Sequence, residues 1–132
     1  MDYTNEARER FKTDCFATDV VGIVIEKADV GYAKCYVDIT DKHHNAENYV
    51  MGGVIFTLAD FAFAVAANTG SPVTVTLSGK IDFFSGTRAK RLYAVAEIEK
   101  DGKHICFYRV TVTDDEKNVI AMVSENGYKM KV

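Results

Sequence analysis

The pattern of apolar and polar residues marks one segment of the chain as different from the rest. From Gly53 to Asn68 there is no proline or further glycine, apolar side chains occur on every face of a helix, and Asp60 carries the only charge. A helix that is apolar all round is typical of a protein interior. We therefore predict a long central helix over residues 53–68 that the rest of the chain must cover.

On both sides of this segment apolar and polar residues alternate, which is the pattern of strands with one buried face. Within residues 73–84 the alternation places Val73, Val75, Leu77, Ile81 and Phe83 on one face. The dipeptide Asp101-Gly102 is a hairpin signal between two of the later strands. Six strands are predicted, at 22–26, 32–39, 73–84, 92–99, 105–113 and 119–129. The order predicts an antiparallel sheet of six strands curved around one helix, an α+β fold.

The chain of 132 residues is long enough for one domain with its own core. We interpret residues 1–132 as a single domain in which residues 1–20 form a helical extension, with a short surface helix within residues 2–14. The edges of the predicted sheet leave backbone groups unpaired, so two copies can join there. We expect a homodimer or a dimer of dimers.

Composition narrows the classes of partner. The net charge of −3 gives no electrostatic basis for binding nucleic acid, and we expect none. The three cysteines are widely spaced and form no metal or redox motif, which suits a reducing compartment. The first residues are acidic and polar, unlike a signal peptide, and Asp60 interrupts the apolar run where a membrane span needs about 20 apolar residues. We expect a cytoplasmic protein that does not insert into a membrane.

The central helix carries two features that chemistry can use. A lone carboxylate at Asp60 is costly to bury unless it is paired or used in a site. At the start of the helix, Gly52 and Gly53 leave backbone N–H groups open to an anion or a polarised carbonyl oxygen. Gly53 and Asp60 are about 10 Å apart along the helix axis, so one copy of the helix does not bring both to one reacting carbon. Two copies in a symmetric dimer can.

These residues resemble a known family. Asn45, five residues, Met51-Gly52-Gly53, six residues and Asp60, followed by a Thr-rich strand and Phe83-Phe84-Ser-Gly86, are similar to the hotdog-fold acyl-CoA thioesterases of the phenylacetic-acid-degradation type. The resemblance covers residues 20–129 in element order and is most specific over residues 45–60. It implies the hotdog fold, an acyl-CoA substrate, hydrolysis without metal or bound cofactor, and a site formed across a dimer.

The resemblance also implies catalytic roles for four positions. The backbone N–H of Gly52 stabilises the negative charge that develops on the thioester oxygen. Asp60 from the partner subunit acts as a general base on water, or as a direct nucleophile. Asn45 orients the water or the carbonyl, and Thr76 hydrogen-bonds the water. Each residue also has a structural alternative. Asp60 is then a paired carboxylate, and the glycine pair allows close helix packing. Asn45 is then a loop asparagine, and Thr76 is an ordinary strand residue.

Further positions are candidates for substrate binding. Gly53 and Met51 lie beside the predicted oxyanion site. Tyr49 and Phe61 are candidates for an acyl pocket, although aromatic residues on a buried helix more often belong to the core. Arg88 and Lys90 lie in a basic cluster that suits coenzyme A phosphates or simply forms a solvated turn.

Two departures from the family pattern keep alternatives open. Met51 stands where histidine is commoner, and it neither titrates nor donates a hydrogen bond to a carbonyl. Hydrolysis by Asp60 and the Gly52 amide is the first hypothesis, and a protein that binds acyl-CoA without turnover is the second. A dehydratase or hydratase is weaker, because such enzymes of this fold use a histidine, and whether His43 or His44 substitutes for it is open. Gly86 stands where proline is common, a change of turn with little bearing on chemistry.

Overall fold

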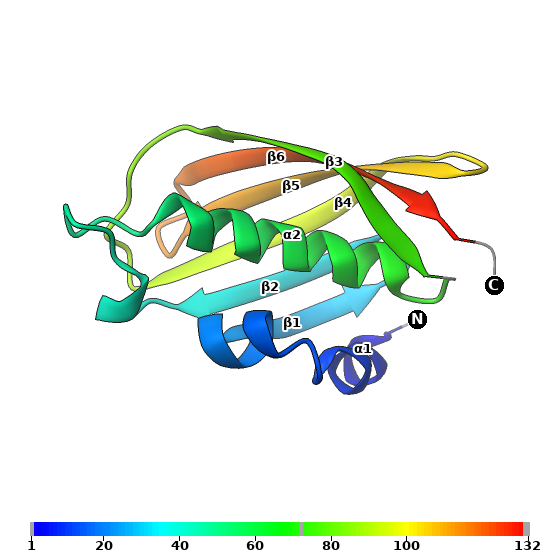
Figure 1. Cartoon of the computed structure of the whole chain (residues 1–132), viewed down its shortest axis with the longest axis horizontal. Helices are drawn as coiled ribbons and strands as arrows, with labels where there is room; N and C mark the ends of the chain where they lie inside the picture. Colours follow the sequence, from blue (N-terminus) through cyan, green and yellow to red (C-terminus); the bar gives the residue numbers. More distant parts are fainter. Residues whose placement is uncertain (1, 72, 131–132) are drawn as a thin grey trace.

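The structure, a computed structural model, describes residues 2–71 and 73–130. A six-stranded antiparallel sheet curves around one long helix, as Figure 1 shows. The elements in chain order are α1 (Thr4–Phe11), a π-helical turn η1 (Phe16–Val21), β1 (Ile23–Asp29), β2 (Tyr32–Asp38), a 3₁₀ turn η2 (Asp41–His43), α2 (Gly52–Asn68), β3 (Thr74–Phe83), β4 (Arg91–Asp101), β5 (Ile105–Asp114) and β6 (Val119–Lys129). This is the hotdog fold, and the predicted order of strands and helix is confirmed.

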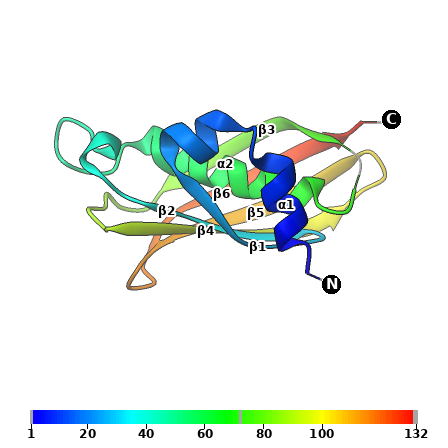
Figure 2. The same cartoon turned by 90° about the horizontal axis from the view of Figure 1, so that it is seen from below.

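The strands lie in the order β1-β2-β4-β5-β6-β3. β3 follows α2 in the chain yet lies at the far edge of the sheet, where it pairs only with β6. β1 occupies the opposite edge, and α1 and η1 lie beside it along one flank of α2 (Figures 1 and 2). The two flanks of α2 therefore differ, because one faces the N-terminal helical segments and the other faces the free edge at β3.

The core forms where α2 meets the inner face of the sheet. Apolar side chains at Leu58, Ala59, Ala62 and Val65 of α2 are fully buried, as are facing residues of the central strands, among them Val37, Leu92, Ala94, Val110, Val112 and Val123. On the α1 flank, the Phe61 ring meets the Phe11 ring edge-on, with 5.6 Å between their centroids. Burial of these side chains is the main force that holds the sheet around the helix.

One side of α2 stays only partly covered within a single chain. The partly or fully exposed residues recur at intervals of three and four, which places them on one side of the helix. Beyond the first turn they are Phe56, Thr57, Asp60 and Ala64, and at the helix start Gly52, Gly53 and Val54 are also partly or fully exposed. Beyond its first turn, the central helix is thus covered least on the side that carries Asp60.

A β-bulge in β3 reverses the alternation of its side chains. Thr76 pairs with Gly127, and Ser78 pairs with the adjacent residue Asn126. Leu77 is therefore the extra residue on β3. Because paired residues project to the same side, Thr76 shares the inner face with Ile81, and Val75 does not. The prediction that Val75, Leu77 and Ile81 lie on one face is therefore wrong, because alternation in sequence does not reveal a bulge.

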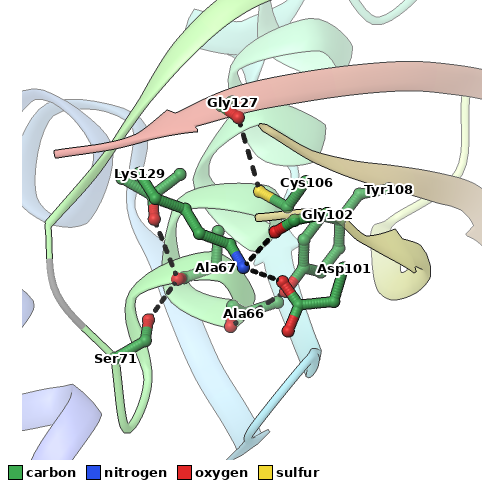
Figure 3. Close-up of polar contacts among 10 residues, drawn as sticks. Ala66, Ala67, Ser71, Asp101, Gly102, Cys106, Tyr108, Gly127 and Lys129 are labelled. Carbon is green, nitrogen blue, oxygen red and sulfur yellow. Dashed lines mark hydrogen bonds and ion pairs between the residues drawn. The ribbon is translucent and has the colours of Figure 1, made fainter. Parts of the chain in front are cut away.

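The C-terminal end of α2 is capped by side chains. The last carbonyl groups of a helix lack partners within it. Here the Ser71 hydroxyl donates to the Ala67 carbonyl at 2.7 Å, and the Tyr108 hydroxyl donates to the Ala66 carbonyl at 3.4 Å, as Figure 3 shows. The Asn68 amide and the Thr69 hydroxyl serve the two preceding carbonyls, and Arg10 of α1 donates to the Asn68 carbonyl. The last carbonyl groups of the helix are therefore satisfied by side chains.

Candidate functional site

The N-terminal end of α2 lacks the side-chain caps that the C-terminal end has. Met51 precedes the helix in an extended conformation and supplies no side-chain cap. The amides of Val54 and Ile55 both donate to the Met51 carbonyl, at 3.0 and 3.3 Å. The amides of Gly52 and Gly53 come before them, where a helix has no internal acceptor to offer. Two N–H groups at the positive end of the helix dipole are therefore available to a partially negative oxygen.

The two glycines have different surroundings. A Cβ atom at Gly52 would lie 3.1 Å from Cζ of Phe83, so glycine at this position allows the Phe83 ring to pack against the helix start. A Cβ atom at Gly53 would meet only the Met51 methyl group, at 3.8 Å. Met51 itself is 55% exposed and lies at the mouth of this open end. The helix start is thus flanked by apolar side chains and by no titratable group at position 51.

Asn45 is held in a tight loop that precedes α2. Its side-chain oxygen accepts hydrogen bonds from the amides of Glu47 and Tyr49, at 3.0 and 3.1 Å. The backbone amide of Asn45 donates to the Tyr49 carbonyl at 2.7 Å, which closes the loop. The side-chain amide nitrogen is what remains for a water or a carbonyl, so the role of Asn45 stays a prediction with only its donor group available.

Tyr49 and Arg88 form a stacked pair beside this loop. The Arg88 guanidinium lies 3.9 Å from the centroid of the Tyr49 ring, and Gly86 leaves room for the same ring. Arg88 also lines a hollow of about 580 Å³ whose other charged residues are Asp114, Asp115 and Glu116. These carboxylates oppose the binding of phosphate there. A role for Arg88, or for the exposed Lys90, in binding coenzyme A stays a prediction.

Phe61 lies in the core and is 3% exposed. Its ring contacts Phe11 on the flank of α2 that faces away from β3. The structure therefore accounts for Phe61 by packing, and its contact with an acyl group stays a prediction.

His43 has both ring nitrogens engaged. Nδ1 accepts from the Thr40 amide at 2.9 Å, and Nε2 lies 2.7 Å from the Val21 carbonyl, to which it donates. This pair of bonds requires the neutral ring with the proton on Nε2. His43 therefore fixes the turn η2 against η1 and is not free to replace a histidine at position 51.

Asp60 and Thr76 meet at a third residue, Glu125. The Thr76 hydroxyl on β3 donates to Oε2 of Glu125 on β6 at 3.2 Å. The Asp60 carboxyl on α2 also acts on the Glu125 carboxyl and raises its pKa, through a side-chain hydrogen bond and through its charge. Glu125 is 2% exposed, and its Oε1 has no hydrogen-bond partner among the residues that the structure describes. Two carboxyl groups and a hydroxyl thus converge beneath the uncovered side of α2.

The surroundings of Glu125 favour its protonated form. Burial raises the pKa of the Glu125 carboxyl to about 9, and the neighbouring Asp60 contributes in the same direction. The hydrogen bond from Thr76 acts in the opposite direction and is the smaller effect. A glutamic acid that keeps its proton at neutral pH is a hydrogen-bond donor, which an ionised carboxylate is not.

Glu125 was not predicted from the sequence. The inward positions of β6 are Ala121, Val123, Glu125 and Gly127, all of them buried. A charged residue in the apolar register of a strand is the signal that marks it. Its proximity to Asp60 had no local signal, because it depends on β6 lying beside β3.

Glu125 makes the free energy of unfolding depend on pH. Between about pH 4.5 and 9 the folded chain holds a proton on Glu125 that the unfolded chain has lost. Stability from this group is therefore complete at low pH and is lost as the pH rises through that window, by up to about 1.4 kcal/mol per pH unit. We expect the melting temperature of the natural chain to fall from pH 5 to pH 9 relative to that of Glu125→Gln. Parallel melting curves across the series would contradict this expectation.

Two structural features are absent from the described part of the chain. Residues 2–71 and 73–130 contain no cluster of three or more His, Cys, Asp or Glu side chains placed to hold a metal ion. No helix in the same ranges is long and apolar enough to cross a membrane.

The fold and the sequence were compared with known proteins. The model of the thioesterase superfamily matches residues 47–121, from the loop before α2 into β6. The acyl-coenzyme A thioesterase PaaI of Escherichia coli is 27% identical over 125 residues, which cover 94% of this chain and 89% of that protein. The 1,4-dihydroxy-2-naphthoyl-CoA hydrolase of Listeria monocytogenes is 25% identical over 107 residues, 79% and 87% of the two chains.

Solved structures agree on the fold. The E. coli PaaI protein from the phenylacetic acid degradation operon superimposes with a TM-score of 0.90 at 24% identity, covering 97% of this chain and 94% of that one. A hypothetical thioesterase protein with coenzyme A from Streptococcus pneumoniae superimposes with a TM-score of 0.84 at 20% identity, over 91% and 96%.

The fold and the open helix start therefore define a hotdog protein of the PaaI-like type. The family match covers more than half of the chain, residues 47–121 of 132. This chain belongs to the thioesterase superfamily, a family of thioester hydrolases.

Proposed function

We propose that this protein is an acyl-CoA thioesterase whose active site is shared by two copies of the chain. The observation that carries the proposal is the contrast along α2: the amides at Gly52 and Gly53 are open at one end, and Asp60 lies on the one uncovered side of the same helix. The similarity to the PaaI thioesterase of E. coli and to the L. monocytogenes CoA hydrolase supports an acyl-CoA substrate. The S. pneumoniae neighbour with coenzyme A supports the same substrate class.

In the proposed reaction water attacks the thioester carbonyl carbon. Asp60 takes a proton from the water, and the Gly52 amide donates a hydrogen bond to the carbonyl oxygen as it becomes negative. The carbon–sulfur bond then breaks, the thiolate of coenzyme A leaves and takes up the proton that Asp60 removed from the water, and the free acid remains. Asn45 and Thr76 are proposed to orient the water and the carbonyl. Direct attack by the Asp60 carboxylate is the variant of this reaction that the same residues allow.

The geometry of α2 favours a site between subunits. Gly52 and Asp60 are eight residues apart, which is about 12 Å along a helix and too far for both to contact one carbonyl group. β3 is an edge strand with unpaired backbone groups, and it exposes Val75 at 43% and Leu77 at 53%. Two copies that pair through β3 bring the uncovered side of each α2 toward the other copy. Asp60 of one copy then faces the helix start of its partner.

Met51 favours a second candidate function, acyl-CoA binding without turnover. The side chain is exposed at the helix start and offers no proton and no hydrogen bond to a carbonyl. Under our proposal the Gly52 amide and Asp60 suffice, because a thiolate leaves readily and needs no strong acid.

A thiol-release assay separates the two functions. We expect the protein to release free coenzyme A from at least one member of a panel of short, medium, long and aryl acyl-CoAs, with saturation kinetics. Calorimetric titration with a non-hydrolysable acyl-CoA thioether measures binding in parallel. Tight binding of the thioether with no thiol released from any acyl-CoA would favour the binding protein and contradict hydrolysis.

A further inference from the structure

The carboxyl pair Asp60 and Glu125 lies within the proposed site, but the reaction as described uses only one of its members. Thr76 occupies Oε2 of Glu125, and no described group donates to Oε1. An unpartnered oxygen on a side chain that is 2% exposed is costly. The carboxyl group that acts on Glu125 is that of Asp60, and two ionised carboxylates repel each other and form no hydrogen bond. A single proton on the pair removes both costs.

Burial decides which carboxyl group holds that proton. Glu125 is buried on the inner face of β6, whereas Asp60 lies on the partly exposed side of α2. Loss of water disfavours the charged form, and it does so more strongly for the more buried group. The proton therefore belongs on Glu125, and on Oε1, because Oε2 already accepts from Thr76.

The elements packed around Glu125 offer no competing partner. On β5, the paired residue Tyr108 directs its hydroxyl to the Ala66 carbonyl, and burial raises the pKa of that hydroxyl, so it stays neutral. On β3, the paired residue Gly79 has no side chain, and a Cβ there would lie 3.6 Å from Cδ of Glu125 and 3.3 Å from the Phe56 ring. Asp60 on α2 is the ionisable group that acts on Glu125, and no Lys, Arg or His among the described residues neutralises it.

We propose that Glu125 is a positioning residue for Asp60: protonated on Oε1, it donates a hydrogen bond that fixes the Asp60 carboxylate with its other oxygen toward the attacking water. This inference rests on the proposed hydrolysis and deepens it. Glu125 keeps its proton throughout, and the proton that Asp60 takes from water does not pass through it. Thr76 donates to the other oxygen, Oε2, and fixes the orientation of the Glu125 carboxyl group.

Variants at position 125 separate positioning from simple packing. Glu125→Gln keeps a donor for Asp60 and an acceptor for Thr76, so we expect kcat near that of the natural chain at pH 7. Glu125→Leu keeps the volume but removes the donor, and we expect kcat to fall about 10- to 100-fold, the loss typical of a hydrogen bond to a charged group, with little change in KM. A loss of hydrolysis in Glu125→Gln would overturn the positioning role, and so would an unchanged kcat in Glu125→Leu.

The pH profile gives a readout that packing alone does not move. In the natural chain kcat falls at alkaline pH as Glu125 loses its proton, whereas Glu125→Gln keeps its activity there. Identical alkaline limbs in the two proteins would overturn the proposal.

Carbon NMR tests the shared proton without any turnover. In protein labelled at the glutamate carboxyl carbon, the resonance that Glu125→Gln lacks should titrate well above pH 7. In Asp60→Asn, which removes the neighbouring charge, the Glu125 titration should move to lower pH. If the Glu125 carboxyl titrated at the pH usual for a glutamate, the shared proton would be contradicted. Absence of thiol release by the natural chain would instead overturn the hydrolysis, and the NMR titration would still decide on the proton.

Discussion

Asp60→Asn is expected to lower kcat for acyl-CoA hydrolysis by about 10²- to 10⁴-fold, the usual contribution of a general base. Asparagine keeps the size and polarity of the side chain but accepts no proton from water. Asp60 lies on the partly exposed side of α2, where its replacement leaves the apolar contacts of the core intact. The loss should therefore appear in kcat, with little change in the melting temperature.

Thiol release and thermal unfolding of the same preparations measure both quantities. Asp115→Asn is the matched control, because it makes the same chemical change at an exposed position. Binding of a non-hydrolysable acyl-CoA thioether should survive in Asp60→Asn, since the amides of Gly52 and Gly53 are unchanged. A variant with the full rate would exclude Asp60 as the base, and the role of its neighbour Glu125 would fall with it.

The extent to which sequence predicts this fold follows from the range of each signal. The period of an apolar helix and the alternation of a strand are local, so α2 and the six strands were predicted nearly at their observed bounds. The bulge at Leu77 was missed because it depends on the register between β3 and β6, and β6 begins more than thirty residues after β3 ends. The partly covered side of α2 was missed for a related reason. A sequence shows that a helix is apolar, but not which side its own chain leaves open.

The residues of the candidate site also differ in whether the local sequence marks them. Asp60 and the glycine pair stand out locally, as a charge within an apolar run and as a helix start without a cap. Thr76 was predicted from resemblance alone, and the structure shows its hydroxyl donating to Glu125, the residue on which Asp60 also acts. Glu125 completes the cluster from β6, the last strand in the chain. Its place beside Asp60 follows from the sheet order, which no local pattern records.

Leu77→Asp is expected to convert the assembly to monomers and to abolish hydrolysis, although Leu77 itself has no role in the proposed reaction. Leu77 lies near the middle of β3, so any two-fold pairing of two β3 edges places it at or close to the contact. Its side chain is 53% exposed in the single chain, and therefore a charge there costs the fold little while it disfavours burial between two copies.

The shared site makes assembly and activity fall together in this variant. One chain alone holds Gly52 and Asp60 about 12 Å apart along α2, and only a partner supplies the missing group. Light scattering after size-exclusion chromatography reports the mass, and thiol release reports the activity of the same fractions. Val20→Asp is the matched control, because Val20 is 70% exposed on η1, on the flank away from β3, and should leave both quantities unchanged. A monomeric Leu77→Asp that hydrolyses acyl-CoA at the full rate would show that one chain contains the whole site.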